Sequence, residues 1–288
     1  MVPEAMDEWA NSARIDELAR LLAHHSNLYY NEASPEITDA EYDAFFDELQ
    51  QLAPEHPQLS KVGSDPVPGS EKVDHLFPMR SLDKATEEEE VAHFVTETTA
   101  QGRRFVCQPK LDGSALSLEY RRGRLIRAAT RGNGERGEDV TANARRIPNI
   151  PESIDWEGDA HVRGEVVMPL DVFRKKYVSI APNPRNLAAG SLRQKTADAG
   201  KGDAADLTFH AYGVMFPSTQ NRHPDSPIPP AFTNDSEAIN WLESNQIAAA
   251  GNEVVEGEDD EAVTQAILDV TKRWTQNRDN AQWEIDGV

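Results

Sequence analysis

The sequence contains one cysteine, Cys107, and no apolar run long enough to cross a membrane. A single cysteine excludes an internal disulfide framework and a zinc site built on thiolates. No early apolar stretch resembles a secretory signal either. These absences predict a cytoplasmic protein with no membrane-spanning segment.

Positive charge is also scarce, because 29 Lys and Arg oppose 50 Asp and Glu, for a net charge of −21. A surface this acidic normally repels nucleic acid. The hydrophobic content of 38% still suffices for a core, so the chain as a whole is not expected to be disordered. We interpret the acidity as a halophilic feature, which keeps a protein soluble in a cytoplasm rich in salt.

The basic residues are concentrated in one part of the chain. Residues 101–150 hold 11 Lys and Arg against 5 Asp and Glu. A locally basic region in an acidic protein indicates a surface that handles phosphate groups. Arginines that guard the exposed edges of hairpins are the alternative for some of them.

Two helices are predicted near the N-terminus. Apolar residues recur at helical spacing over residues 12–31. The sequence Thr38-Asp39-Ala40-Glu41 then matches a capping box, which begins a second helix, and Pro54 and Pro57 end it. We expect a small helical hairpin, followed by a Gly- and Pro-rich linker over residues 60–80.

Acidic and aromatic residues gather on this hairpin. Asp39, Tyr42 and Asp43 share one side of the second helix, while Tyr29 and Tyr30 close the first. Carboxylates beside tyrosines suit a flat cation such as a nicotinamide ring. The alternative is that the acids favour the helix dipole and the tyrosines belong to the core. Spacing alone leaves both interpretations open.

Residues from 104 onward show the alternation of β-strands. A hairpin is predicted over residues 116–130, with further strands at 160–169 and 207–215. Two helical patterns follow within residues 237–278. A last strand is predicted for residues 283–288.

Lys110 lies near the start of this region and is the candidate for its chemistry. The stretch 106–113 predicts a short apolar strand that delivers Lys110 to a tight turn. We expect an amine in this place to be partly desolvated, which disfavours the ammonium form and leaves a nucleophile. The hypothesis is that Lys110 attacks a phosphorus atom and carries a nucleotide covalently.

Residues 132–137 match the pattern Gly-x-Gly-x-x-Gly, which is typical of dinucleotide-binding βαβ units. Such a unit needs an apolar helix after the glycines, to pack on a parallel sheet. Residues 138–146 are polar, and Pro148 and Pro151 follow. The context therefore excludes this interpretation.

Four motifs occur in a fixed order, and together they resemble the bacterial-type NAD-dependent DNA ligases over residues 29–288. They are residues 34–43, Lys110-Leu111-Asp112-Gly113, Thr130-Arg131-Gly132-Asn133-Gly134 and residues 183–194. The resemblance implies an α+β fold. A helical NMN-binding domain with its linker would span residues 1–70. A nucleotidyltransferase (adenylation) domain of antiparallel sheets with flanking helices, truncated at its C-terminal end, would span residues 71–288.

The resemblance also implies roles for single residues. Lys110 would attack the adenylyl phosphorus of NAD and release NMN, and Asp112 would orient that lysine. Glu165 would bind the ribose hydroxyls or a metal, and Tyr212 would stack on adenine. The other residues implied to contact NAD are Tyr29, Tyr30, Asp39, Tyr42 and Asp43 on the NMN half, and Ser81, Leu82, Gln108 and Arg131. Gln108 stands where the family usually has glutamate, and an amide can both accept and donate.

NAD and Mg²⁺ are the implied cofactors, since Mg²⁺ offsets charge on the transferred phosphoryl group. No residue is assigned as a dedicated metal ligand. Nicked double-stranded DNA is the implied partner, in replication and repair, and we expect a monomer. The family continues beyond Asp286-Gly287-Val288 to phosphate-binding lysines and DNA-binding domains, so the chain resembles the adenylation part alone.

Two alternatives stay open at this point. An ATP- or GTP-using nucleotidyltransferase would share the lysine chemistry, but the acidic and aromatic hairpin argues against it. An inactive domain that binds NAD without chemistry is the other, and the absence of the phosphate-binding lysines favours it. Covalent labelling from ATP would support the first, and tight NAD binding without an adenylate would support the second.

A net charge of −21 predicts that stability depends on salt, because self-repulsion destabilises a compact state and salt screens it. We expect the melting temperature to rise between low and molar KCl, as followed by circular dichroism. A melting temperature that stays flat or falls with added KCl would contradict the high-salt interpretation.

Overall fold

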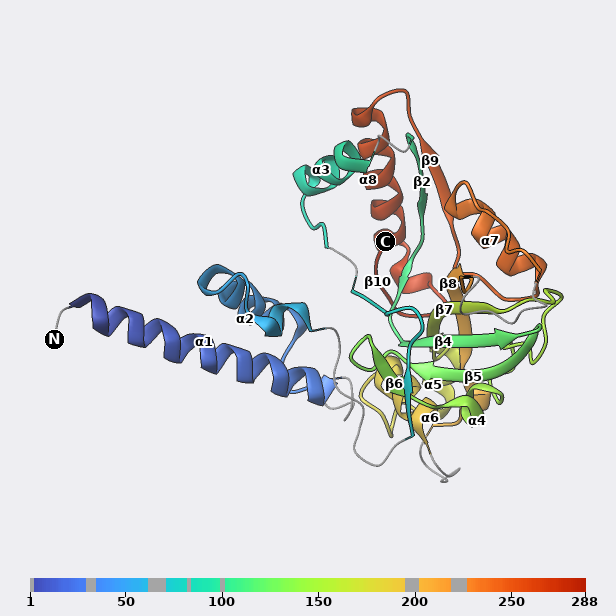
Figure 1. Cartoon of the computed structure of the whole chain (residues 1–288), viewed down its shortest axis with the longest axis horizontal. Helices are drawn as coiled ribbons and strands as arrows, with labels where there is room; N and C mark the ends of the chain where they lie inside the picture. The colour runs from blue at the N-terminus through green and yellow to red at the C-terminus, as the bar shows by residue number, and fades with distance from the viewer. Residues whose placement is uncertain are drawn as a thin grey trace. The chain divides into compact units, whose positions relative to one another are not determined.

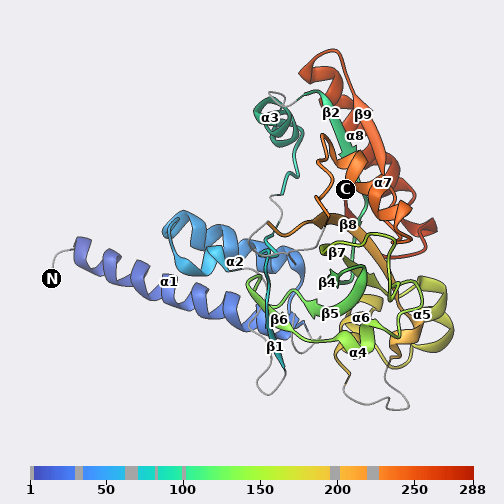
Figure 2. The same cartoon turned by 45° about the vertical axis from the view of Figure 1, so that its right-hand side comes forward.

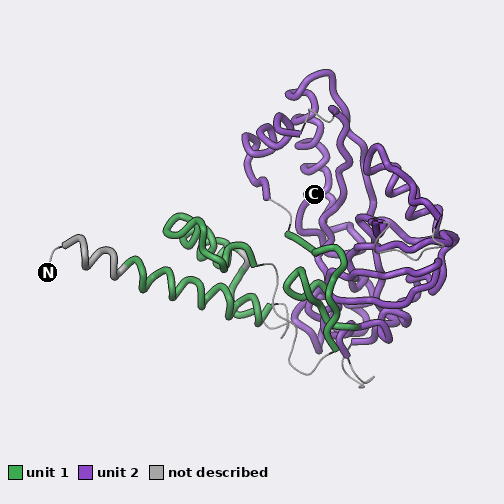
Figure 3. Tube along the Cα trace, in the orientation of Figure 1, with its two compact units in different colours: residues 1–81, 131–139 green, residues 82–130, 140–288 purple. Residues whose placement is uncertain are grey.

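A computed structural model describes residues 3–29, 35–61, 71–81, 84–98, 102–194, 202–218 and 227–288. The chain divides into two compact units (Figure 3). The first holds residues 1–81 with 131–139, and the second holds residues 82–130 with 140–288. These are units of packing, and the domain boundary expected at residue 70 stays a prediction.

The first unit contains the helical hairpin (Figure 1), formed by α1 (Pro3–Asn27) and α2 (Asp39–Leu52). Leu18, Leu22 and Leu49 are fully buried between the helices. Arg14 spans them as well, with Nε and Nη2 each 2.6 Å from the Glu48 carboxylate. The expected hairpin is confirmed, although α1 begins well before residue 12.

The predicted capping box is confirmed. The Thr38 side chain accepts a hydrogen bond from the Glu41 amide at 3.3 Å, and the Glu41 carboxylate accepts one from the Thr38 amide at 2.8 Å. Because these two bonds satisfy amides that an N-terminal turn leaves without partners, they fix where α2 begins. The short helix η2 (Pro57–Ser60) follows.

The first unit also holds a small antiparallel sheet of β1 (Lys72–Asp74) and β6 (Arg136–Glu138). Part of the segment expected to be a linker is therefore a strand. Three residues carry too little periodicity to reveal a strand whose partner lies about sixty residues further along the chain. No helix follows Gly137 directly, so the rejection of a dinucleotide-binding βαβ unit is confirmed.

The second unit is built on a four-stranded antiparallel sheet in the order β5-β4-β7-β8. Its strands are β4 (Ser114–Arg121), β5 (Arg124–Thr130), β7 (Ala160–Val167) and β8 (Thr208–Met215). The predicted hairpin is β4–β5, and it turns at Arg122 and Gly123, which both have positive φ. Two such residues match the right-handed twist of the paired strands.

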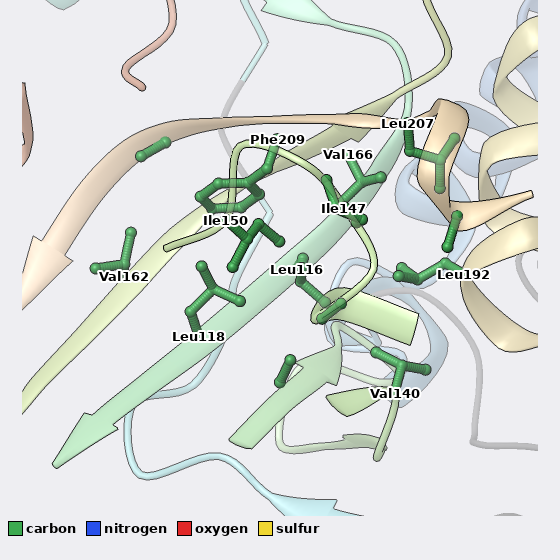
Figure 4. Close-up of a cluster of buried hydrophobic side chains, with 14 of the residues drawn as sticks. Leu116, Leu118, Val140, Ile147, Ile150, Val162, Val166, Leu192, Leu207 and Phe209 are labelled. Atoms are coloured by element: carbon green, nitrogen blue, oxygen red, sulfur yellow. The ribbon is translucent and has the colours of Figure 1, made fainter. Parts of the chain in front are cut away.

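One face of this sheet packs against helices (Figure 2), and the main core lies there. Leu116, Leu118, Val162 and Phe209 extend from three strands into one cluster (Figure 4). Each side chain of this kind contributes about 1.5–3 kcal/mol when fully buried. The helices on this side are α4 (Thr141–Ala144), α5 (Leu170–Lys176) and α6 (Pro184–Arg193), and α7 (Asp235–Ser244) adds Leu242 to the same core.

A second layer of the same unit pairs β2 (Arg104–Cys107) with β9 (Glu253–Glu256). Helix α8 (Asp260–Gln276) packs on this ribbon through Val270, and α3 (Glu88–Thr98) lies beside α8. Between the two layers, β3 (Lys110–Leu111) pairs with β10 (Ile285–Gly287). The short helices η4 (Ala204–Asp206) and η5 (Arg278–Asn280) complete the described elements.

The fold class is α+β, as expected. The predicted strands at 160–169 and 207–215 are confirmed as β7 and β8. Over the described residues, each helix is too short or too polar to traverse a lipid bilayer.

Gly164 offers a test of the sheet. A Cβ atom there would lie 2.4 Å from both the His210 carbonyl oxygen and the Phe209 ring, whereas a Cβ at Gly190 in α6 would meet nothing within 4 Å. We expect Gly164→Ala to lower the free energy of unfolding by about 1–3 kcal/mol. Gly190→Ala, the control, should raise it by about 0.5–1 kcal/mol, since alanine favours helices. Urea denaturation measures both, and an unchanged midpoint for Gly164→Ala would refute the close packing of β7 on β8.

Candidate active site

Lys110 lies where two short strands pair. In the β3–β10 ladder Leu111 faces Ile285 and Lys110 faces Gly287, and the Asp112 amide donates to the Glu284 carbonyl at 2.9 Å. Leu111 and Ile285 are buried in one small cluster. Because successive strand residues point to opposite sides, the burial of Leu111 turns Lys110 outward.

The Lys110 ammonium donates a hydrogen bond to the carboxylate of Asp286 on β10. The two side chains are 53% and 44% exposed. Burial raises the pKa of Asp286, but the hydrogen bond and charge of Lys110, helped by Arg185 and Arg278, outweigh it and hold this pKa below its ordinary value. An ionised carboxylate therefore holds the lysine in place.

This geometry adds one residue to the site. About half of the Lys110 side chain is exposed, because strand alternation places the apolar neighbour Leu111 in the core and Lys110 on the outer side. Asp286 was missing from the predicted site residues. The available signal was the Asp-Gly-Val sequence that ends the chain, which carried no assigned role.

Asp112 is engaged by a largely buried arginine. Arg185 Nε lies 2.9 Å from the Asp112 carboxylate and 3.1 Å from the Gly113 carbonyl oxygen, and the Arg185 side chain is only 17% exposed. Burial lowers the pKa of Arg185 to about 10, against the opposing charges of Asp286 and Glu284. Arg185 therefore faces three carboxylates.

The start of α6 explains how Arg185 is presented. The Asn183 side chain caps the helix by accepting from the Asn186 amide at 2.8 Å, and Pro184 occupies the first turn. Proline is favoured there because its fixed φ fits a helix and its missing N–H is not needed. Part of the donor-rich segment 183–194 thus fixes the helix end that carries Arg185.

Gly113 brings the turn after Lys110 against strand β7. A Cβ atom at Gly113 would lie 2.2 Å from the Val166 carbonyl oxygen, so only glycine permits this approach. Two residues later Ala115 pairs with Glu165 across the β4–β7 ladder. The pairing places Glu165 beside the strand that leads away from Lys110 and Asp112.

Glu165 and Tyr212 belong to the face of the large sheet opposite the main core. On β7, Gly164 and Val166 are on the side that faces that core. Glu165 lies between them, so it is on the opposite side, where it is half-buried. On β8, Gly213 pairs with Arg163 and Ala211 with Gly164, so Tyr212 is the extra residue of a bulge and is 42% exposed. Bulges of this kind redirect a side chain and are frequent beside active sites.

Two family matches cover most of the chain. Residues 69–288 match the NAD-dependent DNA ligase adenylation domain, and residues 8–66 match the DNA ligase-like, N-terminal NAD+-binding domain. The chain belongs to the NAD-dependent DNA ligase family.

Relatives named DNA ligase agree with this. The one from Marinobacter nauticus is 37% identical over 301 residues and covers 96% of this chain and 41% of its own length. The one from Rubrobacter xylanophilus is 34% identical over 312 residues, covering 100% and 43%. The one from Methylorubrum extorquens is 41% identical over 233 residues, covering 73% and 28%. The chain thus spans less than half the length of these relatives.

Solved structures give more distant similarities. The ATP-dependent DNA ligase from bacteriophage T7 in complex with ATP is 10% identical, with a TM-score of 0.38, covering 72% of this chain and 64% of that chain. A Naegleria gruberi RNA ligase mutant with AMP and Mn is 11% identical, with a TM-score of 0.35, covering 78% and 60%.

Gln108, one of the predicted NAD contacts, directly follows β2. The residue is half-buried, and its Nε2 atom is buried without a hydrogen-bond partner among the described residues. A buried donor that lacks a protein partner is suited to a ligand acceptor. With Lys110, Asp112, Glu165 and Tyr212, it is one of five described site residues in the second unit, to which the predicted residue Leu82 also belongs.

The remaining predicted residues, from Tyr29 to Ser81 and Arg131, lie in the first unit. Tyr42 packs on the hairpin core, and its hydroxyl shares a 2.8 Å hydrogen bond with Ser26, so the interpretation as a core aromatic holds at least in part. Arg131 precedes the left-handed turn at Gly132, and its carbonyl oxygen lies 3.2 Å from His75 Nε2. Tyr29 lies two residues after the end of α1, Asp43 is on α2 and Ser81 is exposed. Tyr30, Leu82 and the Asp39 side chain lie outside the described residues.

The Asp112–Arg185 pair supplies a test of this site. Arg185→Met removes one charge from a mostly buried ion pair, which we expect to cost about 3–5 kcal/mol of unfolding free energy. Arg146→Met is the control, because Arg146 pairs with Asp203 at 2.6 Å with both side chains about 40% exposed; it should cost about 0–1 kcal/mol. Equal losses in urea denaturation would contradict a special role for Arg185.

Proposed function

We propose that this chain transfers AMP from NAD to Lys110, which is the first reaction of an NAD-dependent DNA ligase. The observation that carries the proposal is the Lys110 amine, held by Asp286 at the β3–β10 ladder and next to the Asp112–Arg185 pair. Membership of the ligase family supports it through the adenylation domain match over residues 69–288.

The reaction forms one bond and breaks one bond at the adenylyl phosphorus. Neutral Nζ of Lys110 attacks, the P–N bond forms, and the P–O bond to NMN breaks, so that NMN leaves with its phosphate. The ammonium first loses one proton, and the new phosphoramide nitrogen loses a second. Lys110 and Asp286 are both about half-exposed, which lets water take up these protons. Asp286 orients the amine for attack in line with the leaving group.

Other residues bind the substrate. Glu165 and Tyr212 bind the ribose and adenine of the AMP half, with Gln108 at the edge of the base. Arg131, Ser81 and Leu82 contact the nucleotide as well. Tyr29, Tyr30, Asp39, Tyr42 and Asp43 bind the NMN half. The N-terminal NAD+-binding family match over residues 8–66 supports this last assignment.

The candidate active site contains carboxylates that suit a hard divalent cation. Asp112, Glu165 and Asp286 each offer the oxygen donors that Mg²⁺ prefers, and they would bind the metal that phosphoryl transfer requires. Mg²⁺ supplies charge compensation on the transferred phosphoryl group. Asp112 has a second role, since its pairing with Arg185 fixes the turn that follows Lys110.

The adenylate then serves nick sealing in DNA replication and repair. AMP moves from Lys110 to the 5′-phosphate of nicked double-stranded DNA, and the 3′-hydroxyl displaces it to form the phosphodiester bond. We propose that the chain is monomeric and cytoplasmic, and that its charge of −21 is a halophilic feature. The locally basic residues 101–150 support contact with phosphates in spite of that charge.

Intact-mass spectrometry after incubation with NAD and Mg²⁺ tests the proposal. We expect the protein to gain the mass of one adenylyl group. The Lys110→Ala variant should show no such gain. Lys175→Ala is the matched control, because Lys175 also pairs with a carboxylate, Asp171, at 2.9 Å on an exposed surface. It should label at the parent rate.

Three results would contradict the proposal in different ways. Labelling of Lys110→Ala at the parent rate would show that another residue is the nucleophile. Labelling from ATP in place of NAD would indicate an ATP-using nucleotidyltransferase. Tight binding of NAD without any adenylate would indicate a domain that binds but does not react.

A further inference from the structure

Two histidines and a glutamate converge where the helical hairpin turns. One imidazole nitrogen each from His24 and His25 and a carboxylate oxygen of Glu36 all lie within 4.8 Å of one another. His24 Nε2 is 3.4 Å from Glu36 Oε2. Two imidazoles with one carboxylate form a donor set that binds Zn²⁺ and related divalent metals, whereas Mg²⁺ prefers oxygen alone.

His25 is the fixed member of this cluster. Its ring stacks on Phe45 of α2, with centroids 6.2 Å apart and planes inclined by 19°. Its Nδ1 atom is buried and has no hydrogen-bond partner among the described residues. Buried polar atoms are nearly always satisfied by protein, water or an ion, so this nitrogen requires a partner of one of these kinds.

The surrounding charges favour a cation. Both histidines lie in the last turn of α1, where the carbonyl ends of the helix carry partial negative charge. The pKa of Glu41 is lowered, mainly by hydrogen bonds from Thr38 and in smaller part by the charge of His25. The carboxylate of Glu41 is therefore a second one near the cluster. Arg20, four residues before His24, donates to the Asp16 carbonyl oxygen at 3.1 Å.

The donors need only a small movement to close on a metal. Tetrahedral Zn²⁺ at its usual bond lengths sets donor atoms roughly 3.3 Å apart. Since no two of the donor atoms are more than 4.8 Å apart, each separation must shrink by at most about 1.5 Å. The side chains of His24 and Glu36 are 54% and 62% exposed, so rotation of these two can supply the movement while His25 stays packed.

We propose that His24, His25 and Glu36 form a Zn²⁺ site that ties the end of α1 to the segment before α2. The site closes a loop of about ten residues, and such closure reduces the conformational freedom of the unfolded chain. The hairpin core is small, with Leu18, Leu22 and Leu49 as its fully buried residues among those described, so a metal clip adds appreciably to its stability.

Isothermal titration of the whole metal-free chain with ZnCl₂ tests the site. Excess Mg²⁺ in the buffer occupies acidic oxygen sites elsewhere on the surface. We expect one Zn²⁺ per chain and a higher melting temperature with Zn²⁺ bound. His24→Ala and Glu36→Gln should each weaken binding by at least about tenfold. Both side chains are exposed, so the variants should melt like the parent in EDTA.

The chain offers a matched control. His93 and Glu97 on α3 form a similar exposed pair, 3.3 Å apart, but with a single imidazole. His93→Ala should leave the affinity for Zn²⁺ and the stoichiometry unchanged. The proposal is wrong if no stoichiometric Zn²⁺ binds, or if His24→Ala and Glu36→Gln bind Zn²⁺ as tightly as the parent does.

Discussion

The ion pair between Lys110 and Asp286 is the contact on which the candidate active site depends. It joins residues 176 positions apart, so it exists only when β10 has returned to pair with β3. Burial of Leu111 and Ile285 on the other side of the ladder stabilises that return. The hydrophobic contact therefore positions the charged one, and the amine is held at the surface by strand geometry.

Around this pair, opposite charges alternate at close range. Arg185 pairs with Asp112 directly and also interacts electrostatically with Asp286 and Glu284. Burial raises the pKa of Glu284 in spite of the nearby positive charges of Arg278 and Arg185. Partly buried charges of this kind add little net stability, but removal of one partner is costly. The network thus specifies one arrangement of the turn after Lys110, which suits a site that must align a nucleophile.

Much of the local structure could be predicted from sequence. The capping box at Thr38 and the hairpin of β4 and β5 follow from local patterns and are confirmed. The partners of Lys110 and Asp112 could not be predicted, because Asp286 and Arg185 reach them only through tertiary pairing. The cluster at His24 was missed because its glutamate lies twelve residues away.

The most direct test is the single-turnover rate of Lys110 adenylation by NAD in Asp286→Asn. The pair is about half-exposed, so its loss should change the free energy of unfolding by only about 0–1 kcal/mol. If Asp286 positions the amine, the rate should fall by about a hundredfold or more, as misplacement of a reacting group does. Adenylation of Asp286→Asn at the parent rate would contradict the account.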